Sequence, residues 1–458
     1  MSYITNNEIY FLDLLNYLLD NYEYASILVE DSLSKSYLSA KSGVSFGENA
    51  RMTNRGFVIR IFDNGHFAEY SSNLLIPKEE ILESIKKNLT VSEFKTFKDI
   101  FTDTEKSFSG ENIPKEKIND SKILETLKNI TDKGLSFSNV LNFQASFLYQ
   151  QSKKWFISKN RNLYQDNTWA QGSLVSFVKD GEKVRDYYKG YSNLGGMELL
   201  SRMEEDIELV VNTSLELLNA NPLPPGKYTC ICAPEVTGMI VHEAFGHGVE
   251  MDMFVKDRAL ASKHIGEKLA SSLVTMHDSA SSVKESASYF FDDEGNDATD
   301  TVILKDGILQ TGMCDQLSAN RLGVQPTGNG RRENFERKAY TRMTNTYFEA
   351  KKSSLEDMIQ NTKDGLLLES ASSGMEDPKN WGIQCMVTIA REIKDGKLTG
   401  KIYSPIVLTG YVPDVLKDIT EMSDTLYLFG SGFCGKGHKE WCKVSDGGPY
   451  IKTKINLT

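Results

Sequence analysis

The sequence has few cysteines and no long apolar run. Six cysteines are spread irregularly over 458 residues. Cysteines this sparse do not form the disulfide framework of small secreted proteins, and they suit a reducing compartment. No stretch of about 18 consecutive apolar residues occurs, which excludes an ordinary membrane-spanning helix. Neither a disulfide scaffold nor a membrane span is therefore expected.

An excess of basic charge and a secretion signal are also lacking. The chain carries 52 basic and 63 acidic side chains, a formal net charge of -11. That balance argues against a general nucleic-acid binder, which usually presents a basic face. The first 24 residues include Glu8, Asp13 and Glu23 and have no basic start followed by an apolar stretch, unlike a signal peptide. We therefore expect a cytoplasmic protein without nucleic-acid or membrane partners.

The length and composition are those of a globular protein with substantial cores. Hydrophobic residues make up 40% of the chain and charged residues 25%, which is the usual balance for globular domains. A chain of this length is expected to form two or three domains.

Four turn signals recur along the chain, each between runs rich in β-forming residues. An Asn-Gly or Asp-Gly pair predicts a tight hairpin, because its backbone needs positive φ angles. The pairs are at positions 64–65, 180–181, 306–307 and 395–396. Their irregular spacing excludes a solenoid or a propeller. The sequence therefore predicts antiparallel sheets with added helices, an α+β protein.

Helical periodicity and a proline-rich segment predict how the chain is divided. Apolar residues at helical spacing predict helices over 9–19 and 197–218. Three prolines and a glycine within 219–226 cannot continue a helix. We place the domain boundary there, giving domains 1–221 and 222–458. After it we expect a strand over 227–232 and a helix over 234–252, whereas the polar segment 115–133 predicts a surface helix and loop.

One short motif carries the strongest chemical signal. His242 and His247 flank Glu243 within six residues. Neutral imidazole is a common zinc ligand, and a catalytic zinc site uses about three protein ligands and a water. A glutamate beside the first ligand can take the proton from that water as it attacks a carbonyl. The motif therefore predicts a hydrolytic zinc site, although short motifs also recur by chance on ordinary helices.

The spacing of the two histidines demands an irregular helix. Residues five apart on a regular α-helix point about 140° away from each other. A π-type turn, which closes from residue i to i+5, would bring both onto one side, and such turns gather at functional sites. We expect Gly246 and Gly248 to give the backbone the necessary freedom. The prediction is a helix that is irregular or ends near Gly246.

A third ligand must come from elsewhere in the chain. The best remote candidate is Cys434, because a thiolate on a glycine-flanked loop is a good zinc ligand. Glu250 and Asp252 are nearer alternatives. His438 and Cys442 follow Cys434 at intervals of four, so these three residues could instead form a separate Cys/His site or lie on one helix face. Cys434 by itself also fits a buried, inert thiol.

Together with four further segments, the histidine motif resembles one known family. Segments 241–250, 291–295, 326–332, 342–347 and 434–436 match, in this order, the TldD/PmbA metallopeptidases, also called modulators of DNA gyrase. The match is to the TldD-like, metal-binding member of that family. The resemblance is dense from residue 227 to 436 and looser before it, and the chain departs from the family pattern over 437–442. Five ordered motifs are far more specific than any one of them.

The resemblance implies a zinc peptidase. By position in the motifs, His242, His247 and Cys434 would bind Zn2+ and Glu243 would be the catalytic base. The family implies an α/β N-terminal domain followed by a β-rich C-terminal domain that carries the metal-binding helix. It also implies short or unfolded peptides as substrates, reached through a narrow cavity between subunits. The chain would form a homodimer or a heterodimer with a metal-free relative.

Other conspicuous residues have weaker assignments. We interpret the glycine-rich segment 327–332 as a loop near the substrate cavity, where an arginine holds a peptide carboxylate; a tight turn followed by a solvated basic pair is an equal alternative. We expect Asp292, Asp293 and Glu294 to form a solvated turn. The residues that we predict to contact substrate are Asn329, Arg331, Arg332, Asn345 and Tyr347.

The sequence analysis therefore predicts a zinc-dependent peptidase that binds its substrate as an extended strand. The competing hypothesis is a non-catalytic subunit that captures peptides or regulates a toxin system, with a structural metal. The presence of Glu243 beside His242 distinguishes the two, because a structural site needs no base. A third hypothesis is a hydrolase of another carbonyl substrate, such as an amide or an ester.

Overall fold

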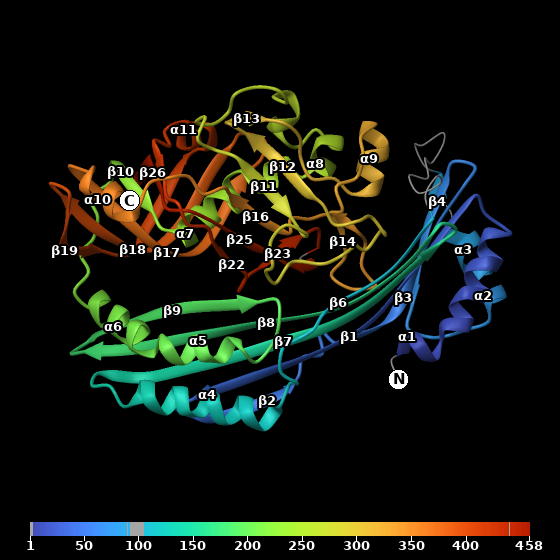
Figure 1. The fold of residues 1–458 in the computed structure, drawn as a ribbon, viewed down its shortest axis with the longest axis horizontal. Helices are drawn as coiled ribbons and strands as arrows, with labels where there is room; N and C mark the ends of the chain where they lie inside the picture. Colours follow the sequence, from blue (N-terminus) through green and yellow to red (C-terminus); the bar gives the residue numbers. More distant parts are fainter. Residues whose placement is uncertain (1–2, 89, 92–104, 439) are drawn as a thin grey trace.

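The long N-terminal sheet forms the base of the molecule (Figure 1). The computed structural model describes residues 3–88, 90–91, 105–438 and 440–458. Nine strands form this sheet in the order β5-β4-β3-β1-β7-β8-β6, with β2 beside β1 and β9 beside β8. The strands are β1 (Tyr24–Ala40), β2 (Gly43–Glu48), β3 (Asn54–Asp63), β4 (His66–Ser72), β5 (Thr90–Val91), β6 (Lys106–Asn112), β7 (Val140–Ser158), β8 (Arg161–Asp180) and β9 (Lys183–Asn193).

Helices cover this sheet at its two ends, and each end has its own core. The 19 residues of β7 span roughly 60 Å at 3.3 Å per residue, so one sheet can serve two helix layers. At one end lie α1 (Tyr3–Asn6), α2 (Glu8–Leu19) and α3 (Lys78–Asn88), and at the other α4 (Asp120–Leu135), α5 (Leu199–Glu205) and α6 (Ile207–Leu217) (Figure 1). The hydrophobic cluster that includes α1, α2 and α3 shares no residue with the cluster that includes α4, α5 and α6.

Two helix predictions need correction. The helix expected over 197–218 is two helices, α5 and α6, interrupted at Asp206. The Asp206 carboxylate accepts a hydrogen bond from the Tyr191 hydroxyl at 3.0 Å and pairs with Lys189 at 3.0 Å, so two side chains of β9 hold the break in place. The segment expected to be a surface helix is α4, which buries Ile123, Leu127 and Ile130 and therefore belongs to the core.

The C-terminal half is built on two more sheets. The first has the order β10-β17-β18-β20-β26-β21, with β19 beside β18, and β10 also pairs with β26. That last pairing closes five of the strands into a ring. These strands are β10 (Gly226–Cys232), β17 (Asp364–Asp377), β18 (Gly382–Lys394), β19 (Lys397–Tyr403), β20 (Ile406–Tyr411), β21 (Glu421–Met422) and β26 (Ile451–Leu457).

The third sheet and two short hairpins complete this half. The sheet has the order β13-β12-β11-β16-β25-β22, and β14 pairs with β15 and β23 with β24. The strands are β11 (Met276–Ser279), β12 (Asp300–Lys305), β13 (Ile308–Leu309), β14 (Gly330–Arg331), β15 (Tyr340–Thr341), β16 (Asn345–Phe348), β22 (Tyr427–Phe429), β23 (Phe433–Lys436), β24 (Glu440–Lys443) and β25 (Ser445–Gly448). The helices are α7 (Pro234–Met239), α8 (Met251–Val255), α9 (Gln316–Leu322), α10 (Leu355–Gln360) and α11 (Val412–Lys417).

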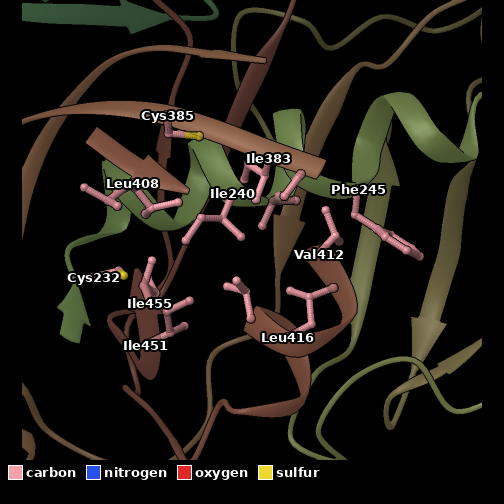
Figure 2. Close-up of a cluster of buried hydrophobic side chains, with 14 of the residues drawn as sticks. Cys232, Ile240, Phe245, Ile383, Cys385, Leu408, Val412, Leu416, Ile451 and Ile455 are labelled. Atoms are coloured by element: carbon pink, nitrogen blue, oxygen red, sulfur yellow. The ribbon is translucent and has the colours of Figure 1, made fainter. Parts of the chain in front are cut away.

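The main core of the C-terminal half lies between the ring and the helical segment that follows β10. Figure 2 shows Ile240 of that segment within a cluster with Leu408 and Ile455, and Phe245 at the edge of this cluster, beside Val412. Both Ile240 and Phe245 are completely buried. Burial of side chains of this size contributes roughly 2 to 3 kcal/mol each, which anchors the helical segment that carries the two motif histidines.

The predicted fold class is confirmed. The pairs at 64–65, 306–307 and 395–396 form hairpin turns, and Asn64 and Gly65 have the positive φ angles expected, 47° and 79°. At 180–181 a hairpin is also present, but its turn residues are Gly181 and Glu182 because Asp180 pairs with Lys183. The helix over 9–19 and the strand over 227–232 are present as α2 and β10. None of the helices in the described ranges is both long and apolar enough to cross a membrane. The division into domains 1–221 and 222–458 stays a prediction.

Candidate metal centre

The helical segment after β10 changes type twice over the residues that include His242 and His247. α7 begins with Pro234, whose fixed φ suits the first turn of a helix. A π-helix follows over Ile240–Gly246, then a 3-10 turn over His247–Val249. The His247 N–H donates to the His242 carbonyl, an i to i+5 bond. The predicted π-type turn is therefore confirmed, although the single helix expected over 234–252 is broken where Glu250 is extended.

The glycines of the motif are needed for space and not for freedom. Gly246 has an ordinary helical φ of -59°, so our expectation of unusual backbone freedom there is wrong. A Cβ at Gly246 would lie 2.4 Å from the Met343 sulfur, and one at Gly248 would lie 2.5 Å from a carboxylate oxygen of Glu376. Real Cβ atoms do not approach other atoms so closely. The close packing of two neighbours therefore requires both glycines.

Three side chains converge on one point. His242, His247 and Cys434 each offer one ligand atom, and these atoms lie within 4.8 Å of one another. The Cys434 sulfur is 3.5 Å from Nε2 of His247, and the two imidazole rings are 5.2 Å apart and nearly perpendicular. This is the one group of its kind within the described ranges. Strand β23 brings in Cys434 from 187 residues away in the sequence.

Burial and mutual attraction set the charges of this group. Burial alone would raise the pKa of the Cys434 thiol, but the neighbouring His247 and His242 outweigh it and hold the pKa well below its usual value. Burial alone would lower the pKa of His247, but Cys434 and then Glu250 raise it well above the ordinary value. The site therefore favours a thiolate, which is the form of cysteine that binds metals.

A buried network of charged side chains holds the His247 ring in its orientation. The Glu250 carboxylate accepts a hydrogen bond from Nδ1 of His247 at 3.1 Å. Glu250 also pairs with Lys436 at 3.1 Å, and Lys436 pairs with Asp252 at 2.7 Å. A carboxylate bonded to the second nitrogen of a histidine fixes which nitrogen faces a metal. Glu250 and Asp252, our alternatives for the third ligand, thus occupy supporting positions in the structure.

Glu243 is placed beside the group at an open cleft. Its carboxylate is 3.7 Å from Nε2 of His247. The cleft has a volume of about 460 Å³, and Glu243, His247, Tyr340, Glu376 and Lys436 are among the residues that line it. Burial raises the pKa of Glu243, and His242 and His247 oppose that shift. A carboxylate with a raised pKa at a cleft is a stronger base than an exposed one.

The donor set fits a zinc ion. Two imidazole nitrogens and one thiolate form a known catalytic set for zinc, with a fourth position left open. Nδ1 of His242 is buried and has no hydrogen-bond partner among the described residues, although buried polar atoms are normally satisfied. His242 also has a neighbouring carboxyl in Asp446, where burial raises the pKa to about 6. On this chemistry, His242, His247 and Cys434 are the residues that would hold a metal.

The sequence analysis missed several residues of the site. Glu376 accepts a hydrogen bond from the Gly248 N–H at 2.9 Å, and burial raises the pKa of Glu376 well above its usual value. Arg342 donates to the Cys434 carbonyl and, at 3.1 Å, to the Glu440 carbonyl. Lys436 could have been found, because alternate residues of a strand share a face and Lys436 lies two residues after Cys434. Arg342 lies in the family motif 342–347, but nothing in that segment indicates its contact with the Cys434 loop, and Glu376 carries no signal in its own segment.

The hairpin of β23 and β24 does not support a separate Cys/His site. Cys434 and Cys442 are direct partners in it, but Cys434 joins the two distant histidines. His438 is exposed at the turn. The motif of three residues at intervals of four is therefore a hairpin and not a helix face.

The predicted substrate residues are dispersed, and three of them are already engaged inside the protein. Asn329 is 2% exposed and donates to Asp278 at 2.7 Å. Asn345 is completely buried and donates to the Ser279 carbonyl at 2.7 Å. The Tyr347 ring stacks on His277 with centroids 5.2 Å apart. None of the three lines the cleft at Glu243, and a substrate role for them remains a prediction.

The two arginines differ from each other. Arg332 is 3% exposed at its side chain and pairs with Glu69 of the N-terminal sheet, so the alternative of a solvated basic pair is wrong for it. Arg331 donates to the Met343 carbonyl at 2.6 Å and lines a second cavity. A substrate role for either arginine remains a prediction.

The acidic segment 292–294 is buried, and our expectation of a solvated turn is wrong. Asp292, Asp293 and Glu294 are 2%, 6% and 2% exposed. Glu294 pairs with Arg60 at 2.6 Å and Asp293 with Lys154 at 2.5 Å, both from the N-terminal sheet. Basic residues distant in sequence compensate these acids, and periodicity in the segment itself cannot reveal such partners.

The fold and the site define a class of protein: an α+β protein with a buried His, His, Cys group and a glutamate beside it at a cleft. The sequence model of the PmbA/TldA metallopeptidase C-terminal domain matches residues 225–456, about half of the chain. The chain belongs to the TldD/PmbA family of metallopeptidases. The resemblance stated from the five motifs is confirmed.

Relatives with this family's names cover most of the chain. A metalloprotease of Methanothermobacter thermautotrophicus is 29% identical over 324 residues, 70% of this chain and 70% of that protein. A protein of Saccharolobus solfataricus named zinc metalloprotease TldD homolog is 27% identical over 346 residues, 74% of this chain and 75% of that protein. These names place the chain among metalloproteases at the level of the family.

Solved structures share the fold over almost the whole length. A proposed modulator of a DNA gyrase from Thermotoga maritima has a TM-score of 0.81 at 16% identity, covering 98% of this chain and 100% of that one. TldE from Thermococcus kodakarensis has a TM-score of 0.69 at 16% identity, covering 97% and 99%. At such identities the likeness concerns the fold alone.

Proposed function

We propose that this protein is a zinc-dependent peptidase that hydrolyses short or unfolded peptides. The observation that carries the proposal is the convergence of His242, His247 and Cys434 with Glu243 beside them at an open cleft. A zinc ion held by the three ligands would polarise the scissile carbonyl and lower the pKa of a nearby water. The name of one relative, a zinc metalloprotease, supports the choice of metal.

Glu243 would act as the general base and acid. Its carboxylate would take a proton from the attacking water and then pass it to the leaving amine. The raised pKa of Glu243, caused by burial, suits the first role because a carboxylate with a higher pKa is a better base. Glu250 would keep the His247 ring in position through its hydrogen bond.

The free edge of β17 supports binding of the substrate as an extended strand. β17 pairs with β18 as far as Asp377, but with β10 only as far as Leu368. The unmatched end reaches the cleft, where Gly374 packs so closely on Glu243 that a Cβ would lie 2.6 Å from its Cγ. Met375 is 67% exposed there. A peptide added to such an edge gains main-chain hydrogen bonds whatever its side chains are.

We further propose that the chain acts as part of a dimer. The fold is shared with TldE of an archaeon, and relatives of this chain are named TldD homologs. Pairing with a metal-free relative, or with a second copy, would enclose the cleft and restrict access to small or unfolded peptides. The division into domains 1–221 and 222–458 and a cytoplasmic location remain predictions from the sequence.

The experiment that tests the function compares Glu243→Gln with wild type. The zinc content of both proteins is measured first, and then hydrolysis of a synthetic peptide mixture is followed by mass spectrometry, with and without a metal-free relative. We expect equal zinc and a loss of rate of about 10²- to 10⁴-fold in the variant, the usual contribution of a general base.

Glu235→Gln is the matched control, because Glu235 lies on α7 of the same helical segment but does not line the cleft. It should keep wild-type activity. Full activity of Glu243→Gln at normal zinc content would contradict the mechanism. Zinc binding without hydrolysis in wild type, under every pairing, would favour the peptide-capturing subunit instead.

A further inference from the structure

A second cavity lies between the long N-terminal sheet and the C-terminal half. Its volume is about 460 Å³, and β7 and β8 line it with Gln150, Lys154 and Trp169. Arg331 lines it from the C-terminal half. A volume of this size is typical of sites for small organic ligands. None of its lining residues lines the cleft at Glu243.

One hairpin separates this cavity from the metal centre. In the β23 and β24 pair, Phe433 is matched with Lys443 and Cys434 with Cys442. Directly opposed residues share a face and successive residues alternate between faces, so Phe433, Trp441 and Lys443 lie on the face opposite to Cys434. All three line the second cavity. Cys442, which shares a face with Cys434, also lines the cavity, so one hairpin contributes residues to both sites.

Lys443 has no acidic partner at this face. Its side chain is buried, and Nζ donates to Oε1 of Gln171 at 2.6 Å and to the Gly432 carbonyl at 3.3 Å. Nζ also lies 4.6 Å from the centroid of the Trp169 ring and 4.5 Å from that of Phe433. Among the described residues no carboxylate lies within ion-pair distance of it. Glu285 attracts it from farther away, and burial raises the pKa of Glu285. Neutral oxygens and aromatic faces attract a cation but do not cancel its charge.

Arg331 is the second cation in the cavity without a carboxylate. Its guanidinium donates to the Met343 carbonyl at 2.6 Å and lies over the Tyr289 ring at 5.4 Å. The other three cations of the cavity are compensated, since Lys154 pairs with Asp293 at 2.5 Å, Arg51 with Glu333 at 2.7 Å, and Arg332 with Glu69. Lys443 and Arg331 therefore remain free to pair with a ligand.

The remaining acids of the cavity wall do not supply the missing charge. Glu30 accepts hydrogen bonds from Ser32 and from the Phe335 N–H. Asp292 accepts from Asn296 and from the Gly330 N–H. Burial, and then Glu294, raises the pKa of Asp292 to about 8, and burial raises that of Glu30. Asp292 therefore favours the uncharged form at neutral pH and repels an anion little.

We propose that this cavity binds a small organic carboxylate with an aromatic body, whose carboxylate pairs with Lys443 beside Trp169 and Phe433. The buried ammonium gains a counter-charge, and the aromatic walls gain an apolar surface to pack on. The carboxylate can belong to a free acid or to the C-terminus of a peptide. The site does not require a metal, so it stands apart from the proposed peptidase activity.

The test uses the full chain treated with a chelator, because a bound zinc would itself attract carboxylates. Isothermal titration calorimetry measures binding of 3-phenylpropionate, of its uncharged analogue 3-phenylpropionamide, and of N-acetyl-Ala-Ala-Phe with a free C-terminus. We expect saturable binding of at least one acid, and binding of 3-phenylpropionamide weaker than that of 3-phenylpropionate by at least about tenfold, the usual value of a charge-assisted contact. The two acids distinguish a free metabolite from a peptide end.

Lys443→Met should weaken binding of the acid by at least about tenfold. Lys401→Met is the matched control, since Lys401 also lies over an aromatic ring, Tyr403 at 4.8 Å, but is exposed outside the cavity. It should bind like wild type. Equal affinity for acid and amide, unchanged binding by Lys443→Met, or no binding of either acid would overturn the proposal. The acid and amide comparison needs only wild type, so it decides the matter even if the variant does not fold.

Discussion

Two buried charge networks of this protein differ in how completely their charges are matched. At the contact between the two halves, Arg60 pairs with Glu69 at 2.9 Å and with Glu294 at 2.6 Å, and Arg332 also pairs with Glu69. At the metal centre, Lys436 pairs with Glu250 and Asp252, but Glu243 and Glu376 pair with no lysine or arginine of the described residues.

The pKa shifts of the carboxyl groups differ between the two networks in the same way. Burial alone would raise the pKa of Glu69, but Arg332 and Arg60 outweigh it and lower the pKa to about 2. Burial raises the pKa of Glu376 well above its usual value, and no cation of comparable strength opposes it. A matched network holds two surfaces in one arrangement, whereas unmatched groups at a cleft are available to a metal ion or a substrate.

The largest expected effect comes from breaking the metal group itself. Cys434→Ser should lose most of the zinc, from about one ion per chain in wild type, because a hydroxyl is a much poorer zinc ligand than a thiolate. Elemental analysis of purified protein measures this. His247→Ala should show the same loss.

Cys442→Ser is the matched control for this test. Cys442 is the direct hairpin partner of Cys434 and is equally buried, but it is not in the ligand group. We expect it to keep its zinc. Zinc retained by Cys434→Ser would contradict the assignment and move the third ligand to Glu250 or Asp252.

Breaking the matched network should lower the free energy of unfolding and leave the zinc content unchanged. Arg332→Met removes one of the two cations of Glu69, whose side chain is 18% exposed, while the Arg332 side chain itself is 3% exposed. Loss of one partner of a buried pair costs roughly 3 to 5 kcal/mol in the free energy of unfolding, and urea denaturation at neutral pH measures this. Zinc content per folded chain should not change.

Arg51→Met tests whether burial of the ion pair causes the loss of stability expected for Arg332→Met. Arg51 also joins the two halves through Glu333, but its side chain is 58% exposed. An exposed pair contributes about 0 to 1 kcal/mol, so this variant should unfold close to wild type. Equal losses in the two variants would show that burial does not distinguish the two pairs.

The smallest expected effect concerns Lys443, a cation left out of both networks. Burial lowers its pKa from 10.5 to about 7. Between these values the unfolded chain binds the proton more strongly than the folded chain, so stability should rise with pH across this window. One pKa unit corresponds to about 1.4 kcal/mol, and we expect a rise of roughly 2 kcal/mol from pH 7.5 to 9 that Lys443→Met lacks.

Urea denaturation at several pH values measures this difference. Lys305→Met, which alters an exposed lysine at the hairpin of β12 and β13, should follow wild type at every pH. Parallel curves for wild type and Lys443→Met would contradict the assignment of an uncompensated buried ammonium.

Local signals predicted the local parts of the fold and of the site. The turn residues at 64–65 and 395–396 have positive φ angles. Asn, Asp and Gly adopt such angles more readily than other residues, so the residue types predict the turn. The spacing of His242 and His247 predicted the i to i+5 turn that the structure contains, because helical geometry allows few ways to align such a pair. The choice of Cys434 came from loop chemistry and family resemblance, and the structure brings it to the histidines.

Errors arose where a residue's role depends on partners far away in the chain. The acids 292–294 have the composition of a solvated turn, but Arg60 and Lys154 compensate them from the N-terminal sheet. The break at Asp206 depends on Tyr191 and Lys189 of a neighbouring strand. No window of sequence contains both members of such pairs.

By itself the sequence determined the hairpins, the α+β class and the paired histidines with their glutamate, because torsional preference and helical spacing act within a few residues. The tertiary structure alone decided that Glu376 lies against Gly248, that Lys436 links two acids, and that one hairpin faces two cavities. Burial and charge compensation act through space, so they are decided only when distant strands are brought together.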